Sequence, residues 1–352
     1  MTALATFGVP GYRGEAFMAE TLASLQAQTC ADFEVLISLD GPQPTLEAVC
    51  RPFLEDPRFR LAVQPERLGW VGNLNWLMEH TTTPYWLYQQ QDDVLEPTYL
   101  EVLLAEAARM PEAAVVYTDI VTFGTLHVRL SQPSVGGSPV GRQLTLIQDH
   151  HSAVAFRGLT RTDALHATGR IRPNGANCYG SDTLWMSSIA RSGELVRVPE
   201  PLYRKRYHDA NEHSRWARWP EEERARAWRL HCAHLLAEAL LVEATVAERR
   251  LLWSAVLTRL VTGRPTDYLP ASYREGEAQQ QQVQRFFNLV RRQALVDVPA
   301  LLGTDWPALR RWSRAWLAGP EGSAGGSTGR SAGGETRALA EEVGDGVDAA
   351  QG

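Results

Sequence analysis

Through the first 200 residues, short apolar runs alternate with segments whose apolar positions recur at helical spacing. The apolar runs are typical of buried strands, which we expect at residues 4–9, 33–40, 59–64, 85–91 and 113–123. The helically spaced segments lie between them, at residues 15–28, 45–54, 71–80 and 97–108. This alternation predicts an α/β fold, with helices on both faces of a mostly parallel sheet.

Polar side chains gather where several of these predicted strands end. They occur at residues 10–12, 40–41, 67 and 92–93. Because ligands of open α/β sheets bind at the carboxyl ends of the strands, this distribution predicts a site along that edge of the sheet.

The stretch YQQQDDVLEP, residues 88–97, places three glutamines and two adjacent acids directly after an apolar strand. Neighbouring carboxylates repel each other, and each resists removal from water. The stretch is therefore either a solvated acidic turn or a site for a cation or a cationic transition state. Its place beside the other polar strand ends favours the site.

Beyond residue 214 the pattern becomes helical. Pro220 followed by three glutamates is a helix start, and Thr245-Val-Ala-Glu248 is a capping box at which the long helical stretch should break. Two apolar stripes follow, formed by Trp253, Val256, Leu257 and Leu260, and by Val283, Phe286, Phe287 and Val290. We expect a helical region over residues 215–318 and a disordered Gly/Ser/Ala-rich tail over residues 319–352.

One further stripe, formed by Leu309, Trp312 and Trp316, lies among three arginines. Such a stripe would suit peripheral contact with an anionic membrane surface. Docking of the stripe on the body of the protein is the alternative that we favour.

The amino-acid composition restricts which classes of binding partner and which cellular compartment we expect. The chain has 352 residues, a formal net charge of −6 and 44% hydrophobic residues, which is ordinary for a globular protein and argues against nucleic acid as a partner. Its four cysteines have no metal or redox spacing, and no apolar run approaches the roughly 20 residues of a membrane helix. The first residues lack the pattern of a secretion signal. We expect a cytoplasmic protein, at the inner face of the membrane if the stripe binds lipid.

Five stretches, in chain order, resemble the motifs of family 2 glycosyltransferases, which have the GT-A fold. The first is the turn VPGYRG, and the second is TLASLQAQTCADFEVLISLDGP. The third, RLGWVGNLNWLM, resembles a Gly-Asn helix start, and the fourth, QQQDDVLEPTYLEVL, resembles the metal-binding acids. The fifth, YGSDTLWMSSIARSGELVRVPEPLYRKRYH, is similar to a Glu-Asp helix followed by a Pro-Leu-Tyr strand. The resemblance predicts a glycosyltransferase domain over residues 1–214.

This resemblance implies an inverting transfer of a sugar from a nucleotide-diphosphate sugar to an acceptor hydroxyl. The acceptor would be a glycan, a lipid-linked sugar or a small molecule, in polysaccharide, lipopolysaccharide or other glycoconjugate biosynthesis. A divalent metal, Mg²⁺ or Mn²⁺, would neutralise the departing diphosphate as a Lewis acid, and both ions prefer hard oxygen ligands.

The resemblance also implies which residues hold the metal. Asp92 matches the second acid of the family's Asp-x-Asp motif, and His208 matches a histidine that reaches the metal or the diphosphate. Gln90 stands where the first acid usually stands, so it would bind a ribose or a metal-bound water without adding charge. Asp93 would support the loop or the acceptor sugar. For His208 the alternative is a structural role.

Donor-binding positions follow from the same comparison. Pro10 and Tyr12 lie in the first turn, where Tyr12 would stack near the base or simply pack. Asp40 matches the acid that contacts the nucleobase, and capping of its own turn is the alternative. Arg67 would meet phosphate unless it is solvated. Asn73 would begin a helix facing the nucleotide, where an N-cap is the alternative role.

The resemblance implies that Asp182 is the catalytic base, because the family places its base at this point, where a helix opens after a loop rich in Gly and Asn. The family usually has Glu-Asp here, whereas this chain has Ser181-Asp182. An acid at a helix start is also favourable for structural reasons alone.

Two other functions stay open from the sequence. A non-catalytic nucleotide-sugar binding protein is suggested by the missing acids at Gln90 and Ser181. A nucleotidyltransferase would share the strand order, but it needs a basic Gly-rich phosphate loop that GVPGYRGE does not provide.

Overall fold

A computed structural model describes residues 3–148, 153–208, 216, 218–262 and 276–294. The chain divides into two compact units, residues 1–261 and 262–352. The arginine-flanked stripe at residues 309–316 and the Gly/Ser/Ala-rich segment at residues 319–352 lie outside the described residues, so the expectations for them stay predictions.

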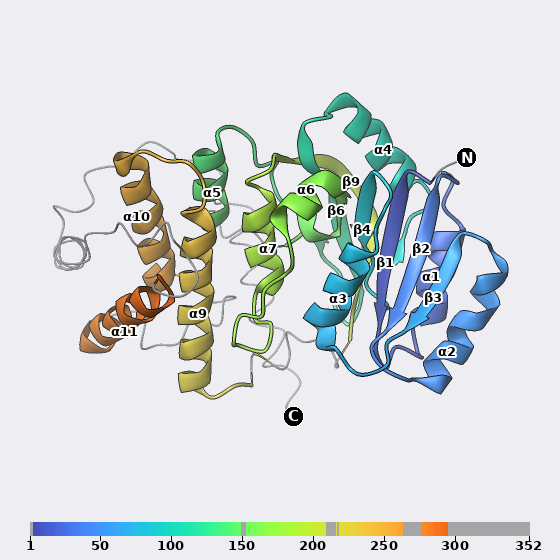
Figure 1. Ribbon diagram of the computed structural model, residues 1–352, viewed down its shortest axis with the longest axis horizontal. Coiled ribbons are helices and arrows are strands. Elements are labelled where there is room, and N and C mark those ends of the chain that lie inside the picture. Colours follow the sequence, from blue (N-terminus) through green and yellow to red (C-terminus); the bar gives the residue numbers. More distant parts are fainter. Residues whose placement is uncertain (1–2, 149–152, 209–215, 217, 263–275, 295–352) are drawn as a thin grey trace. The chain divides into compact units, whose positions relative to one another are not determined.

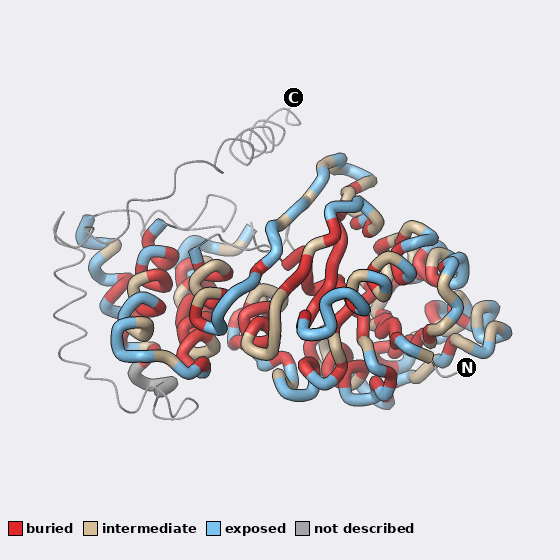
Figure 2. The backbone as a smooth tube through the Cα atoms, turned by 90° about the horizontal axis from the view of Figure 1, so that it is seen from above, coloured by how far each residue is buried: buried red, intermediate tan, exposed pale blue. Residues whose placement is uncertain are grey.

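The N-terminal half of the sheet is parallel. Its strands lie in the order β3 (Phe59–Val63), β2 (Phe33–Leu39), β1 (Ala5–Gly11) and β4 (Tyr85–Tyr88). Figure 1 shows α3 (Gly69–Glu79) on one face of these strands and α1 (Met18–Gln26) on the other. β1, β2 and β4 are buried along almost their whole length (Figure 2), which is why they appear in the sequence as continuous apolar runs, whereas in the edge strand β3 only Phe59 is buried.

The other half of the sheet mixes directions. The short β8 (Leu159–Arg161) runs antiparallel to both β4 and β6 (Ala113–Gly124), and β6 pairs in parallel with the long β9 (Glu194–Tyr207). β5 (Val94–Leu95) pairs with β9, and β7 (Arg129–Leu130) with β6, both antiparallel. The expected α/β fold is confirmed. The short antiparallel strands were not predicted, because two or three residues carry no periodicity.

Helices fill the connections between the strands. Those of the sheet region are α2 (Pro44–Cys50), α4 (Tyr99–Arg109), α5 (Pro139–Gln148), α6 (Thr162–Thr168) and α7 (Ser181–Ile189). Two 3₁₀ turns, η1 (Arg51–Glu55) and η2 (Ala155–Arg157), complete them. The helix expected over residues 45–54 ends at Cys50 because Pro52 has no N–H to continue the α-helical bonding.

The helices α9 (Glu221–Ala239) and α10 (Val246–Thr262) follow the sheet. The predicted break between them is confirmed, because Thr245 and Glu248 form a reciprocal capping box, with the Glu248 carboxylate 2.8 Å from the Thr245 backbone nitrogen. The stripe from Trp253 to Leu260 is buried. Both helices belong to the same compact unit as the sheet, whereas the sequence placed a boundary near residue 214.

The second unit contains α11 (Gly276–Ala294), in which the four apolar residues of the predicted stripe are buried. No helix in the described part of the chain has both the length and the apolar character that crossing a bilayer requires.

Candidate active site

The loop after β4 is fastened by its glutamines. Gln89 donates from Nε2 to the carbonyl of Asp93 at 2.9 Å. Gln91 accepts from the backbone N–H of Tyr12 at 2.8 Å and donates to the Tyr12 carbonyl at 2.9 Å. A methyl group at Gly14 would lie 2.3 Å from Gln91 Oε1, so only glycine leaves room for this clamp. The loop is therefore an ordered structure rather than a solvated acidic turn.

Asp93 is fully buried, and its carboxylate joins this loop to β9. Tyr203 donates its hydroxyl to Oδ2 at 2.7 Å, and the backbone N–H of Arg206 donates to Oδ1 at 2.8 Å. Burial, together with the charge of Asp92, raises the pKa of Asp93 above its ordinary value. With both oxygens bonded inside the protein, Asp93 is placed to support the loop.

Asp92 faces a different partner. Its Oδ2 lies 2.9 Å from His208 Nε2, at the end of β9, while its Oδ1 is buried and has no hydrogen-bond partner among the described residues. Arg206 donates from Nε to the Asp92 carbonyl at 2.9 Å, and the His208 ring lies 4.9 Å from the ring of Phe17. A buried carboxylate oxygen without a partner beside an imidazole is an arrangement that a divalent cation would complete.

Two cations lie beside these acids, Lys205 buried and Arg157 largely buried. Arg157, at the end of η2, places Nε 3.6 Å from Asp93 Oδ2, and Lys205 comes from β9. Burial acts to lower the pKa of Arg157, but the oxygens of Tyr203 and Asp93 outweigh it and hold the pKa above its ordinary value. Burial lowers the pKa of Lys205 to about 8, with the charge of Arg157 acting in the same direction. Sequence reasoning missed both residues, because nothing in AFRGLT or LYRKRYH distinguishes them from surface cations.

Asp182 lies in the first turn of α7, and the structure brings it to the same group of charges. Its negative charge acts to raise the pKa of both Arg157 and Lys205, and the charge of Asp93 acts on the two residues in the same direction. Oδ1 accepts from the backbone N–H of Thr183 at 2.9 Å. Oδ2 has no partner in the described ranges and is the oxygen available to a ligand.

The loop before Asp182 is organised by Asn174, which sequence reasoning also missed. Its buried amide donates to the carbonyl of Tyr179 at 2.6 Å and accepts from the N–H of Ala176 at 3.0 Å. Gly180 precedes α7 with φ of +61°, and a methyl group there would meet His231 at 2.7 Å. The helix start is thus fixed by both its backbone conformation and its packing.

The other end of α7 is held by α5. Arg142 donates from Nε to the carbonyl of Ala190 at 2.6 Å and from Nη2 to that of Arg191 at 3.3 Å. Gln143 donates to the carbonyl of Ser187 at 2.8 Å and accepts from the Ser187 hydroxyl. These buried bonds satisfy carbonyls at the carboxyl end of the helix that carries Asp182.

The expected nucleotide end lies at the ends of β1 and β2. Asp40 is buried and accepts from the backbone N–H groups of Leu68 at 2.6 Å and Gly69 at 3.1 Å. Arg67 is largely exposed, with Nε 3.6 Å from Asp40 Oδ2 and Cζ 4.2 Å from the centroid of the Tyr12 ring. Pro10, in β1, is opposite Ser38 of β2. The structure therefore groups Tyr12, Asp40 and Arg67.

Asn73 differs from the sequence expectation. The helix begins at Gly69 rather than near Asn73, because the Asp40 carboxylate receives the N–H groups at its start. Asn73 lies inside the helix, 1% exposed, where it donates to the Ser38 carbonyl at 2.8 Å and accepts from the Ser38 hydroxyl at 2.5 Å. Its amide is committed to β2, so we do not place it in the donor site.

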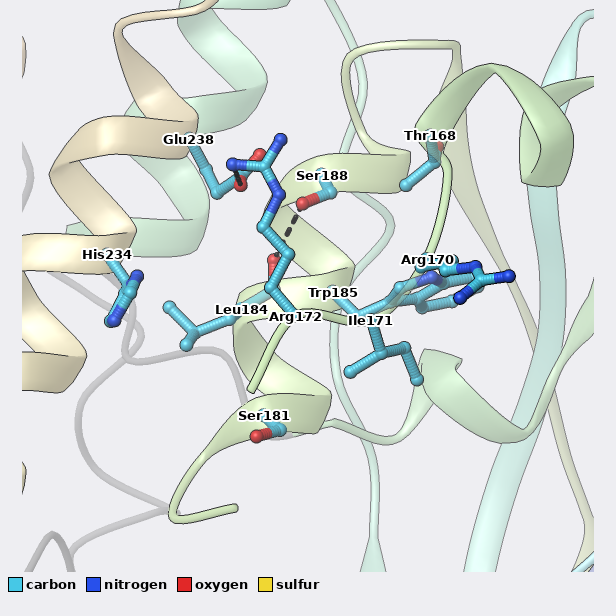
Figure 3. Close-up of a pocket in the computed structure, with 10 residues that line it drawn as sticks. All are labelled: Thr168, Arg170, Ile171, Arg172, Ser181, Leu184, Trp185, Ser188, His234 and Glu238. Carbon is cyan, nitrogen blue, oxygen red and sulfur yellow. Dashed lines mark hydrogen bonds and ion pairs between the residues drawn. The ribbon is translucent and has the colours of Figure 1, made fainter. Parts of the chain in front are cut away.

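A separate small hollow lies along α7 (Figure 3). It is lined by Ser181 and Ser188 of α7, by Arg172 from the preceding loop, and by His234 and Glu238 of α9. Nη1 of Arg172 lies 4.0 Å from Oε1 of Glu238. Its lining includes neither Asp92 nor Asp182, so it is distinct from the group of charges described above.

Comparison with known proteins gives consistent matches. The sequence model described as "Glycosyl transferase family 2" matches residues 6–166. An uncharacterized glycosyltransferase of Haemophilus influenzae is 21% identical over 209 residues, covering 57% of this chain and 64% of that protein, so the chain spans less than two thirds of this relative.

Two solved structures share the fold. S. aureus TarS 1–349 in complex with UDP-GlcNAc is 16% identical with a TM-score of 0.60, and the match covers 84% of each chain. The mannosyltransferase PcManGT from Pyrobaculum calidifontis, in complex with GDP-Man and Mn²⁺, is 16% identical with a TM-score of 0.50, covering 90% of this chain and 81% of that one. At such low identity these likenesses show the fold.

Proposed function

We propose that this chain, whose residues 6–166 match the glycosyl transferase family 2 model, transfers a sugar, with inversion, from a nucleotide-diphosphate sugar to an acceptor hydroxyl. The observation that supports this proposal is that Asp92, which pairs with His208 at 2.9 Å, and Asp182 both lie close enough to Lys205 for their charges to act on its pKa. Ligands of α/β folds bind at the carboxyl ends of the strands.

Tyr12, Asp40 and Arg67 would receive the nucleotide. The Tyr12 ring and the Arg67 guanidinium offer flat faces to a base, while the remaining N–H groups of Arg67 can meet phosphate. That TarS and PcManGT were solved with UDP-GlcNAc and GDP-Man supports a donor of this class.

Asp92 and His208 would hold a divalent cation; the PcManGT complex contains Mn²⁺. The unpartnered Oδ1 of Asp92 and the adjacent imidazole fit such an ion. No third His, Cys, Asp or Glu joins them within the described ranges, so the remaining ligands would be water and the diphosphate. When bound, the cation supplies Lewis-acid stabilisation of the diphosphate charge.

Asp182 would act as the general base. Its anchored Oδ1 fixes the carboxylate, and the available Oδ2 would take the proton of the acceptor hydroxyl as that oxygen bonds to the anomeric carbon. The bond from that carbon to the diphosphate breaks on the opposite face, which inverts the configuration. Arg157 and Lys205 add positive charge near the diphosphate.

The acceptor would be a hydroxyl of a glycan, a lipid-linked sugar or a small molecule in cytoplasmic glycan biosynthesis. Peripheral membrane contact would come from the stripe at residues 309–316.

The decisive experiment measures free nucleoside diphosphate released from a panel of sugar nucleotides, with and without acceptor hydroxyls. We expect release from at least one of them to require an acceptor. Binding of sugar nucleotides without any release would identify a non-catalytic binding protein. Formation of sugar nucleotide from sugar phosphate and nucleoside triphosphate would identify a nucleotidyltransferase.

A further inference from the structure

Gln90 is bonded to a buried cation, and this bond fixes the direction of its amide. Arg157 Nη2 lies 3.1 Å from Gln90 Oε1. A guanidinium has five N–H donors and no acceptor, so the amide atom that faces it has to be the oxygen. The Gln90 side-chain nitrogen therefore points away from Arg157.

Arg157 is itself held from its other sides. Nη1 donates to the Ala153 carbonyl at 3.3 Å, and Nε lies 3.6 Å from Asp93 Oδ2. Its Cζ lies 5.6 Å from the centroid of the Tyr203 ring, and the side chain is 11% exposed. Turning the guanidinium away would remove its positive charge from the buried Asp93, which is costly in a protein interior. The partner of Gln90 is thus fixed in place.

Gln90 Nε2 has no hydrogen-bond partner in the part of the chain that the structure describes, and the side chain is partly exposed. It belongs to the loop that carries Asp92. A carboxylate at this position would present an oxygen, which accepts, whereas the fixed amide presents an NH₂ group, which only donates. The site therefore offers a hydrogen-bond donor at a place where an acid would offer negative charge.

We propose that Arg157 is a positioning residue for donor binding: it fixes the Gln90 amide so that its NH₂ group donates to an oxygen of the nucleoside diphosphate. The inference rests on the proposed function. The receiving oxygen is one of the diphosphate, which can only accept, whereas a ribose hydroxyl could equally donate to an acid at this position. This contact needs no divalent cation, because the amide lone pairs face Arg157.

The test replaces Gln90 by glutamate, which keeps the shape and the contact with Arg157 but turns the donating nitrogen into an acceptor oxygen. Titration calorimetry in EDTA measures the Kd of UDP and GDP, and the one that binds the wild type serves as the probe. We expect Gln90→Glu to weaken that binding at least tenfold, because two acceptors then face each other. The 2′,3′-dideoxy form of the probe should show the same loss, and a loss that disappears with it would assign the contact to the ribose and overturn the inference.

Arg157 is tested through its coupling to Gln90. In an Arg157→Met background the amide is free to turn over, so Gln90→Glu should weaken binding less than threefold there. Arg157→Lys, which can still donate to Oε1, should keep binding within threefold of the wild type. The matched control is Arg161→Met, since that guanidinium binds Asp163 and the Pro111 carbonyl and should leave the Kd unchanged.

Equal binding by the wild type and Gln90→Glu in EDTA would overturn the inference and leave sugar transfer standing. The inference would also be overturned if Gln90→Glu weakened nucleotide binding equally in the wild type and in the Arg157→Met background. If Arg157→Met does not fold, a tenfold weakening of binding by Arg157→Lys alone would overturn it. A wild type that binds neither nucleotide would overturn the proposed function as well.

Discussion

Asp92 and Asp93 are adjacent in the chain, yet their carboxylates have opposite surroundings. Both carboxylate oxygens of Asp93 accept hydrogen bonds, from Tyr203 and from Arg206. Oδ1 of Asp92, in contrast, has no hydrogen-bond partner among the described residues. One acid therefore fixes the loop, which leaves the other available to a ligand. Because hydrogen bonds from Tyr203 and Arg206 compensate the burial of Asp93, the loop can hold two adjacent carboxylates.

Replacing Asp92 by asparagine tests the metal assignment. The amide removes the charge that would bind the cation, so we expect Asp92→Asn to lose most transfer activity together with its dependence on Mg²⁺ or Mn²⁺. Transfer assays with and without EDTA measure both effects, with Asp163→Asn, an exposed acid of α6, as the control. Full wild-type activity in EDTA would instead assign the charge compensation to Arg157 and Lys205.

Replacing Asp182 by asparagine tests the base. The side chain keeps its shape and its contact with Thr183 but cannot take a proton. General-base catalysis contributes about 10²–10⁴-fold to a rate, so transfer should fall at least about a hundredfold while nucleoside-diphosphate binding is retained. A transfer assay beside titration calorimetry separates the two. Normal transfer would exclude Asp182 as the base, and lost nucleotide binding in a folded variant would place it in the donor site.

The sequence indicated Asp92, Asp182 and His208 because each lies in a stretch that resembles a motif of the family. It could not indicate Arg157 or Lys205, since their roles depend on neighbours brought together only by folding. Asn73 shows the reverse case, in which a suggestive motif residue is used for packing against Ser38.

At the scale of elements, α7 carries Asp182 at one end and is anchored by Arg142 at the other. Removing the guanidinium by Arg142→Met would leave carbonyls of Gly137, Ala190 and Arg191 without it. We expect a loss of about 2–3 kcal/mol in the free energy of unfolding, measured by urea denaturation.

The control for this prediction is Arg109→Met on α4, an exposed arginine that pairs with Glu106 and whose loss should change stability by less than about 0.5 kcal/mol. An equal effect of the two substitutions would show that the anchor of α7 contributes nothing specific.

The boundaries of the helices and strands show how much of the secondary structure could be predicted from the sequence. The buried parallel strands were predictable from apolar runs, and the break before α10 from a capping box. The strand expected over residues 85–91 stops at Tyr88. The backbone N–H of Gln89 still donates to the Gly8 carbonyl of β1 at 3.0 Å, but the chain then turns, and Gln91 bonds to Tyr12.

At the scale of the whole molecule, β6 and β9 form the centre of the second half of the sheet, and Asp119 lies at the irregularity in their pairing. The carboxylate is buried and accepts from Arg129 and Arg197, with shortest distances of 2.6 and 2.7 Å. Burial alone would raise the pKa of Asp119, but the hydrogen bonds from the two arginines outweigh it and lower the pKa.

A carboxyl group with a lowered pKa in the folded state stabilises the fold above its unfolded pKa, and this contribution is lost as the pH falls through the folded pKa. We therefore expect Asp119→Asn to reduce the free energy of unfolding by about 2 kcal/mol at neutral pH and by less below about pH 4. Urea midpoints at several pH values measure this difference. A pH-independent effect of the substitution would contradict the role given to the charge.

Strand β9 supplies Tyr203 and Arg206 to Asp93, and His208, directly after the strand, pairs with Asp92; each contact spans more than 100 positions of sequence. During synthesis, β1 to β4 are complete long before this strand has left the ribosome. Until then, Asp92 and Asp93 lack the partners that this end of the chain provides. Contacts so distant in sequence form late in folding. A nascent chain that ends before β9 would have all the residues of the expected nucleotide end and no working centre. Catalytic competence should therefore arrive in one step, late in biosynthesis, when the last strand enters the sheet.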